Sequence, residues 1–167
     1  MTAPPPFRTP ENWCWHEGPV TGSTVVFDLD GVLSDAAGRQ HLLEWPRRDW
    51  RAFFEAVGED PVIEEVGTLL RALDPTLRIA LLTARPLRVQ PQTLGWLERN
   101  HLRWDVLIMR DHGDYDAARE FKQRTVSELR TAGMELCLAF EDDPRNVEMF
   151  RRSGVPCVYI HSGYYDF

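Results

Sequence analysis

The chain has 167 residues, of which 43% are hydrophobic and 27% are charged. These values are ordinary for a soluble globular protein, and the length suffices for one domain with a sizeable core. The net charge of −7 provides no basic field that would attract nucleic acid non-specifically. This argues against a DNA-coating protein, but not against an enzyme that handles a nucleic-acid end.

Cysteine spacing and hydropathy indicate the compartment. Cys14, Cys137 and Cys157 form neither a CxxC pair nor a zinc-ligand spacing, which favours a reducing environment. The proline-rich N-terminus lacks the apolar core of a signal peptide. No apolar run approaches the roughly 18 residues of a membrane span. We therefore expect a cytoplasmic protein without a membrane partner.

The first part of the chain differs in composition from the rest. Residues 1–22 contain five prolines together with Trp13 and Trp15, which predicts an irregular N-terminal arm ahead of a main domain over residues 23–167. Residues 34–60 are polar and charged and too short to form a domain, so we expect a small or minimal cap. Apolar residues within this insertion recur at helical spacing: Trp50, Phe53, Phe54 and Val57.

Strand-like and helical patterns alternate along the main domain. The expected strands cover residues 24–27, 78–83, 105–109, 136–140 and 156–160, and the expected helices lie near residues 62–73, 92–99, 115–132 and 145–152. This alternation predicts an α/β fold with a doubly wound, Rossmann-like parallel sheet of five strands. The expected strand order is 3-2-1-4-5, in which the first and fourth strands are neighbours.

Acidic residues follow the first and fourth expected strands. Asp28 and Asp30 end the first strand, and Asp142 and Asp143 end the fourth. Ligands of open α/β sheets bind at the carboxyl ends of the strands, so these acids should converge. Two unit charges about 4 Å apart repel by roughly 4 kcal/mol in a partly screened medium. A divalent cation relieves this repulsion, and oxygen ligands suit Mg²⁺. The alternatives are an ordinary Asp/Gly turn or an acidic surface rim.

An acid-lined Mg²⁺ site suits phosphoryl transfer. Asp28 is the candidate nucleophile, and Asp30 is the candidate general acid and base, for which its pKa must be raised. Thr83, at the end of the second strand, offers a hydroxyl to a phosphate oxygen, or caps a helix. Lys122 offers a point charge, or lies on a solvated helix face. It is the only lysine among nineteen basic residues, which suggests that arginine would not serve there.

These segments resemble the four ordered motifs of the haloacid dehalogenase (HAD) superfamily. The resemblance rests on residues 27–33, Leu82-Thr83, Lys122 and residues 141–143, and it spans residues 24–161. It implies a HAD-like, Mg²⁺-dependent phosphatase that forms an aspartyl-phosphate intermediate. The implied metal ligands are Asp28, the backbone carbonyl of Asp30, Asp142 and Asp143.

The chain is also similar to the 3′-phosphatase domain of bacteriophage polynucleotide kinases. That resemblance implies that Arg39 and Arg85 grip the scissile phosphate, and it extends through the C-terminal His161-Ser162-Gly163. The chain departs from the pattern in one loop, where Ala118 replaces an acid and Asp116 stands where an arginine is usual. No kinase half is expected in this chain.

Three functions remain open at this stage. The first is removal of 3′-phosphate from polynucleotide ends or nucleotides. The second, favoured by the net charge and by Ala118 and Asp116, is hydrolysis of a small phosphometabolite or 5′-nucleotide. The third is a non-catalytic binding module, against which the intact set of Asp28, Asp30, Thr83, Lys122 and Asp142 argues.

The cap carries a further group of residues with two interpretations. Arg47, Arg48 and Arg51 form a cluster that is typical of a solvated helix face, although it could meet an extended polyanion. Trp45 and Trp50 could stack on bases. Their helical neighbours favour core packing instead.

Overall fold

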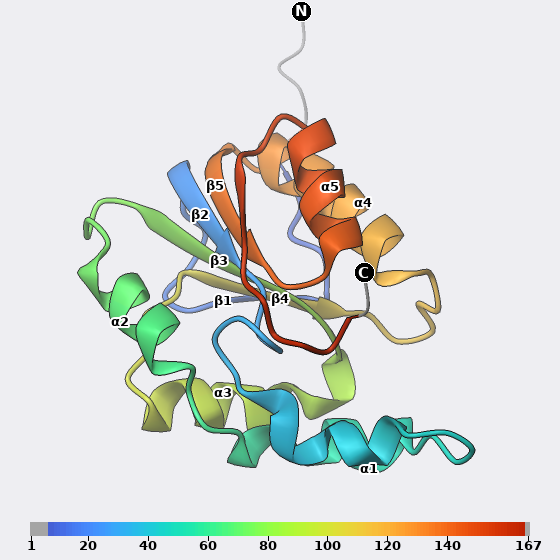
Figure 1. Ribbon diagram of the computed structural model, residues 1–167. Helices are drawn as coiled ribbons and strands as arrows, with labels where there is room; N and C mark the ends of the chain where they lie inside the picture. The colour runs from blue at the N-terminus through green and yellow to red at the C-terminus, as the bar shows by residue number, and fades with distance from the viewer. Residues whose placement is uncertain (1–6, 166–167) are drawn as a thin grey trace, which may run out of the picture.

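The computed structural model describes residues 7–165. At its centre lies a six-stranded sheet of order β1-β4-β3-β2-β5-β6 (Figure 1). The edge strand β1 runs antiparallel to β4, and the other pairs are parallel. The strands are β1 (Trp13–Trp15), β2 (Gly22–Phe27), β3 (Arg78–Pro86), β4 (Val106–Arg110), β5 (Met134–Glu141) and β6 (Cys157–Tyr159).

The five expected strands occur in the expected order, as β4-β3-β2-β5-β6, which confirms the doubly wound α/β fold. The count of five is wrong, because the arm that the sequence predicted to be irregular adds β1. Three residues are too few to show the alternation that identifies a strand. β1 is held by the sheet edge instead, where the Asn12 side chain donates to the carbonyl of Met109 at 2.7 Å and Trp13 is buried.

Along the central strands, successive side chains point to opposite faces of the sheet and pack into two separate hydrophobic cores. In β2, Val25 and Phe27 belong to one core, and Val26 belongs to the other. Helices α2 and α3 cover the first face of the sheet, and α4 and α5 cover the second (Figure 1). Their bounds are α2 (Glu64–Ala72), α3 (Gln90–Arg99), α4 (Ala118–Thr131) and α5 (Pro144–Arg152). In residues 7–165, no helix has the length and apolar character needed to cross a membrane.

The cap-like insertion folds into three short helices beside α3 (Figure 1). They are the 3₁₀ helix η1 (Ala36–Leu43), the α-helix α1 (Trp50–Glu55) and the 3₁₀ turn η2 (Val57–Glu59); a further 3₁₀ turn, η3 (Leu87–Val89), precedes α3. Phe53 of α1 and Val57 of η2 are the buried apolar side chains with which these helices pack against the domain. The expected core packing of two tryptophans is wrong, since Trp45 is 84% exposed and Trp50 is 49% exposed. The six-residue α1 turns Phe53 inward and leaves Trp50 partly in solvent.

The arm strand generates a stability prediction. Replacing Trp13 with alanine removes a ring that is only 6% exposed, and we expect a loss of about 3 kcal/mol in the free energy of unfolding. Trp45→Ala is the matched control, because a largely exposed ring should cost no more than about 0.5 kcal/mol. Urea denaturation followed by far-UV circular dichroism measures both variants. Equal midpoints for Trp13→Ala and the unaltered protein would contradict a stabilising role for β1.

Candidate active site

Three carboxylates meet where β2 and β5 end. Asp28 follows β2, and its amide donates to the carbonyl of Phe140 in β5 at 3.1 Å. One oxygen each from Asp28, Glu141 and Asp142 lies within 4.8 Å of the others, and all three residues are buried. The structure therefore brings together Asp28 and Asp142, as their places at adjacent strand ends require.

A single ammonium group is inserted among these acids. The buried Nζ of Lys122 lies 2.6 Å from Oε2 of Glu141 and 3.1 Å from Oδ1 of Asp28. Burial alone would lower the pKa of Lys122, but the attraction of Asp28 and Glu141 outweighs it and raises that pKa. Because Lys122 is buried and contacts both acids, the solvated-helix interpretation of this residue is wrong. It projects from α4, whose buried side also carries Phe121 and Thr125.

One lysine does not neutralise three carboxylates. Burial, and then the charge of Glu141, raise the pKa of Asp28 well above its usual value. The same two causes raise the pKa of Asp142 to about 8. Both oxygens of the Asp142 carboxylate are buried without a hydrogen-bond partner among residues 7–165. A buried carboxylate with unused oxygens fits a hard divalent cation such as Mg²⁺, which coordinates oxygen and offsets the repulsion.

Gly31 explains how Asp142 approaches the turn after β2. Its φ of +82° lies in the left-handed region that favours glycine. A Cβ atom added at this position would overlap with the carboxylate of Asp142. The glycine thus serves both the turn and the close approach of the acid.

The carboxylate of Asp30 does not join these acids and contacts two arginines instead. Oδ1 of Asp30 accepts from Nη2 of Arg39 at 2.5 Å and from Nη2 of Arg85 at 2.6 Å. Burial by itself would raise the pKa of Asp30, but Arg85 and then Arg39 outweigh it and hold this pKa below its usual value. A general acid needs a raised pKa, and in this state of the protein the shift at Asp30 has the opposite sign.

Asp60 was missed by sequence reasoning although it holds both arginines. Its carboxylate accepts from Nε and Nη2 of Arg39 at 2.9 and 2.7 Å, and from Nη2 of Arg85 at 3.4 Å. Ser34 links the group, since its hydroxyl donates to Asp60 at 2.5 Å and accepts from Arg85 at 2.8 Å. An acid before a proline at the end of an insertion reads as a loop residue, so only the fold identifies Asp60.

Two predicted site residues have local partners. The buried hydroxyl of Thr83 accepts from the amide of Arg85 at 3.2 Å and so shapes the end of β3. Asp143 caps α5 and forms an ion pair with Arg145 at 2.8 Å. Glu141, rather than Asp143, joins the carboxylate group with Asp28 and Asp142.

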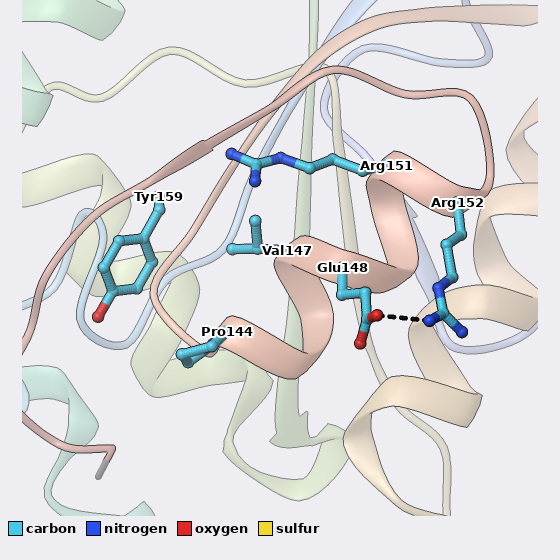
Figure 2. A pocket seen from close by; sticks show the side chains of 6 residues that line it. All are labelled: Pro144, Val147, Glu148, Arg151, Arg152 and Tyr159. Carbon is cyan, nitrogen blue, oxygen red and sulfur yellow. Dashed lines mark ion pairs between the residues drawn. The ribbon is translucent and has the colours of Figure 1, made fainter. Parts of the chain in front are cut away.

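A separate hollow of about 690 Å³ lies between α5 and β6 (Figure 2). Within it, Arg152 pairs with Glu148 at 2.6 Å. None of the predicted site residues lines this hollow, whose walls are Pro144, Val147, Glu148, Arg151, Arg152 and Tyr159.

Comparisons with solved structures agree with the fold. A chain of the Pnkp1/Rnl/Hen1 RNA repair complex is 25% identical, with a TM-score of 0.71 over 83% of this chain and 42% of that chain. This chain thus spans less than half of that relative. The class C acid phosphatase of Bacillus anthracis, solved with tungstate bound, is 14% identical, with a TM-score of 0.63 over 89% of this chain and 70% of that one. A HAD-superfamily hydrolase of Geobacter sulfurreducens is 17% identical, with a TM-score of 0.55 over 82% and 88%.

Comparison of sequences gives the family. No curated protein matches the chain. The sequence profile of the polynucleotide kinase PNKP phosphatase domain matches residues 22–165, which is most of the chain and contains every residue of the site described above. The chain belongs to the PNKP phosphatase-domain family of HAD-like phosphatases.

Proposed function

We propose that the protein is a Mg²⁺-dependent phosphomonoesterase that removes 3′-phosphate from polynucleotide ends or nucleotides. The observation that carries this proposal is the position of Asp28. Its buried carboxylate stands at the end of β2, 3.1 Å from the ammonium of Lys122 and beside the uncompensated Asp142. This is the environment that a carboxylate nucleophile for a phosphate ester requires.

The proposed reaction has two steps. An oxygen of Asp28 attacks phosphorus, and the bond between phosphorus and the 3′-oxygen breaks while Asp30 donates a proton to the leaving alcohol. Asp30 then accepts a proton from water, whose oxygen attacks the aspartyl-phosphate, releasing inorganic phosphate and restoring Asp28. Lys122 orients Asp28, and its charge favours the ionised form of this carboxylate before the attack.

Mg²⁺ would be held by the carboxylates of Asp28 and Asp142 and by the backbone carbonyl of Asp30. It supplies positive charge that offsets the repulsion between an anionic substrate and the acids. Asp143 remains a candidate ligand, although its pairing with Arg145 favours Asp142 as the direct one.

The arginine pair supports recognition of phosphate. Guanidinium groups bind phosphate through parallel N–H donors, and those of Arg39 and Arg85 are already oriented toward the site by Asp60. A phosphate that accepts from these donors would release Asp30 from them. Thr83 would offer its hydroxyl to a further phosphate oxygen.

The choice of a polynucleotide end rests on the family and on the similarity to a chain of an RNA repair complex. Hydrolysis of a small phosphometabolite or 5′-nucleotide is the second candidate, because the net charge is −7 and Asp116 replaces an arginine. A panel of a 3′-phosphorylated oligonucleotide, 3′- and 5′-nucleotides and sugar phosphates separates the two. Hydrolysis of the small esters with no release from the oligonucleotide would select the second.

The nucleophile assignment predicts the effect of Asp28→Asn. Because an amide does not form the acyl phosphate, we expect phosphate release to fall by at least about a thousandfold, with the far-UV circular dichroism unchanged. Asp111→Asn, at an exposed acid outside the carboxylate group, is the control and should retain full activity. Turnover by Asp28→Asn at a rate close to that of the unaltered protein would refute the assignment.

The metal assignment predicts a change in stability as well as in activity. Mg²⁺ at about one hundred times its Kd should stabilise the folded state by about 2.7 kcal/mol, seen as a rise in Tm, and EDTA should abolish phosphate release. Asp142→Asn should lose most of the Mg²⁺-dependent rise, whereas Asp143→Asn should keep it. The reverse order would identify Asp143 as the direct ligand, and no rise in the unaltered protein would argue against the site.

The position of Asp60 predicts a loss in substrate handling. Asp60→Asn keeps the size of the side chain but removes the charge that aligns Arg39 and Arg85, so we expect kcat/KM to fall at least about tenfold. Thermal unfolding separates this effect from lost stability, and Asp49→Asn, which alters an exposed helix cap, is the control. Unchanged kcat/KM in a folded Asp60→Asn protein would show that the arginines do not need this acid.

A further inference from the structure

Two tryptophans of the cap have exposed indole rings. Trp45 is 84% exposed and Trp50 is 49% exposed, and they are separated by four residues. The other four tryptophans, Trp13, Trp15, Trp96 and Trp104, are buried or half-buried. Large exposed rings lose contact with water when a ligand covers them, which makes such a pair a candidate binding surface.

Two arginines lie between these tryptophans in the sequence. Arg47 and Arg48 are exposed, and neither forms an ion pair with any residue in the range 7–165. By contrast, the neighbouring Arg51 is paired with Glu55 at 2.8 Å. Arg47 and Arg48 are therefore free to pair with an anionic ligand, although the chain as a whole has a net charge of −7.

Part of this surface is connected to Arg39 by direct packing. The guanidinium carbon of Arg39 lies 4.2 Å from the centre of the Phe53 ring, and the Phe53 and Trp50 rings are 5.8 Å apart, edge to face. The amide of Asp49 donates to the carbonyl of Leu42 at 2.7 Å, which ties the loop that carries Trp45 back to η1. The helix that bears Arg39 and the exposed rings therefore form one unit beside the site.

We infer that the cap surface, defined as Trp45, Arg47, Arg48 and Trp50, binds the nucleotides that precede the 3′-phosphate in a single-stranded polynucleotide. This inference rests on the proposed function. Bases of any sequence stack on aromatic rings, and arginines contact the phosphates between them. A strand whose terminal phosphate lies against Arg39 has its next nucleotides available to the neighbouring cap surface, so recognition should depend on strand length and little on sequence.

Binding tests the surface independently of catalysis. Fluorescence anisotropy with a labelled 3′-phosphorylated 12-nucleotide strand is measured with Mg²⁺ in the Asp28→Asn background, which prevents turnover. Adding Trp45→Ala should raise Kd about fivefold or more, and Trp45→Phe should recover most of the affinity. Arg47→Ala with Arg48→Ala should reduce the slope of log Kd against log salt concentration by about 1.4. Arg152→Ala, at an exposed arginine on α5, should change neither quantity.

Steady-state kinetics with the active protein provide a second test of the cap surface. Trp45→Ala should raise KM for the 3′-phosphorylated strand about fivefold or more, while kcat and the hydrolysis of a 3′-mononucleotide stay the same. Equal losses on strand and mononucleotide would overturn the inference, since they would indicate a general effect on the site.

The outcomes distinguish the two proposals. A Kd that is identical with and without Trp45 overturns the cap-surface inference and leaves the phosphatase proposal standing. Trp45-dependent binding without phosphate release from any ester refutes the phosphatase proposal alone. If sedimentation shows that Trp45→Ala dissociates an oligomer and strand binding is unaffected, the rings serve contacts between copies of the chain and the inference fails.

Discussion

The candidate site depends on an excess of buried negative charge. Asp28, Glu141 and Asp142 lie close together at the ends of β2 and β5, and among residues 7–165 only the side chain of Lys122 forms ion pairs within this group. A fold selected for stability alone would replace such acids with apolar side chains, because burying unbalanced charge is costly. Perturbed carboxylates of this kind cluster at functional sites, where a bound ion or substrate supplies the missing charge.

Asp28 and Asp30 are separated by a single residue, yet their carboxylates lie in different electrostatic environments. Asp28 lies with Lys122 and the acids of β5, so its pKa is raised. Asp30 lies with Arg39 and Arg85, so its pKa is lowered. The difference comes from the elements that surround each carboxylate, with α4 and β5 on one side and the cap and β3 on the other. These shifts are opposite to those that a nucleophile and a general acid need, and in the proposed reaction a phosphate that binds Arg39 and Arg85 would release Asp30 from the groups that lower its pKa.

Much of this arrangement was predictable from the sequence, because the spacing of apolar residues indicates which helices and strands are buried and on which side. The alternation of strands and helices predicted the sheet, and its order placed Asp28 and Asp142 at neighbouring strand ends. Asp60 escaped prediction because its role depends on how an irregular insertion folds back onto Arg39 and Arg85. The sign of the Asp30 pKa shift depended on the same contacts. The exposure of Trp45 was misjudged because this residue lies in a turn between two short helices and not on a helical face.

The pairing of β1 with β4 also affects how molecules of this protein can meet. An open sheet offers unpaired backbone groups at both margins, and those margins recruit strands from other chains. Here the short antiparallel strand β1 covers the five-residue β4 and becomes the edge itself, so the two edges of the sheet in residues 7–165 are β1 and β6. Each of these two edge strands is three residues long, which leaves little backbone for a strand of another chain to pair with. By covering the longer β4, the N-terminal segment limits strand-by-strand polymerisation, a role separate from the chemistry at the carboxyl ends of β2 and β5.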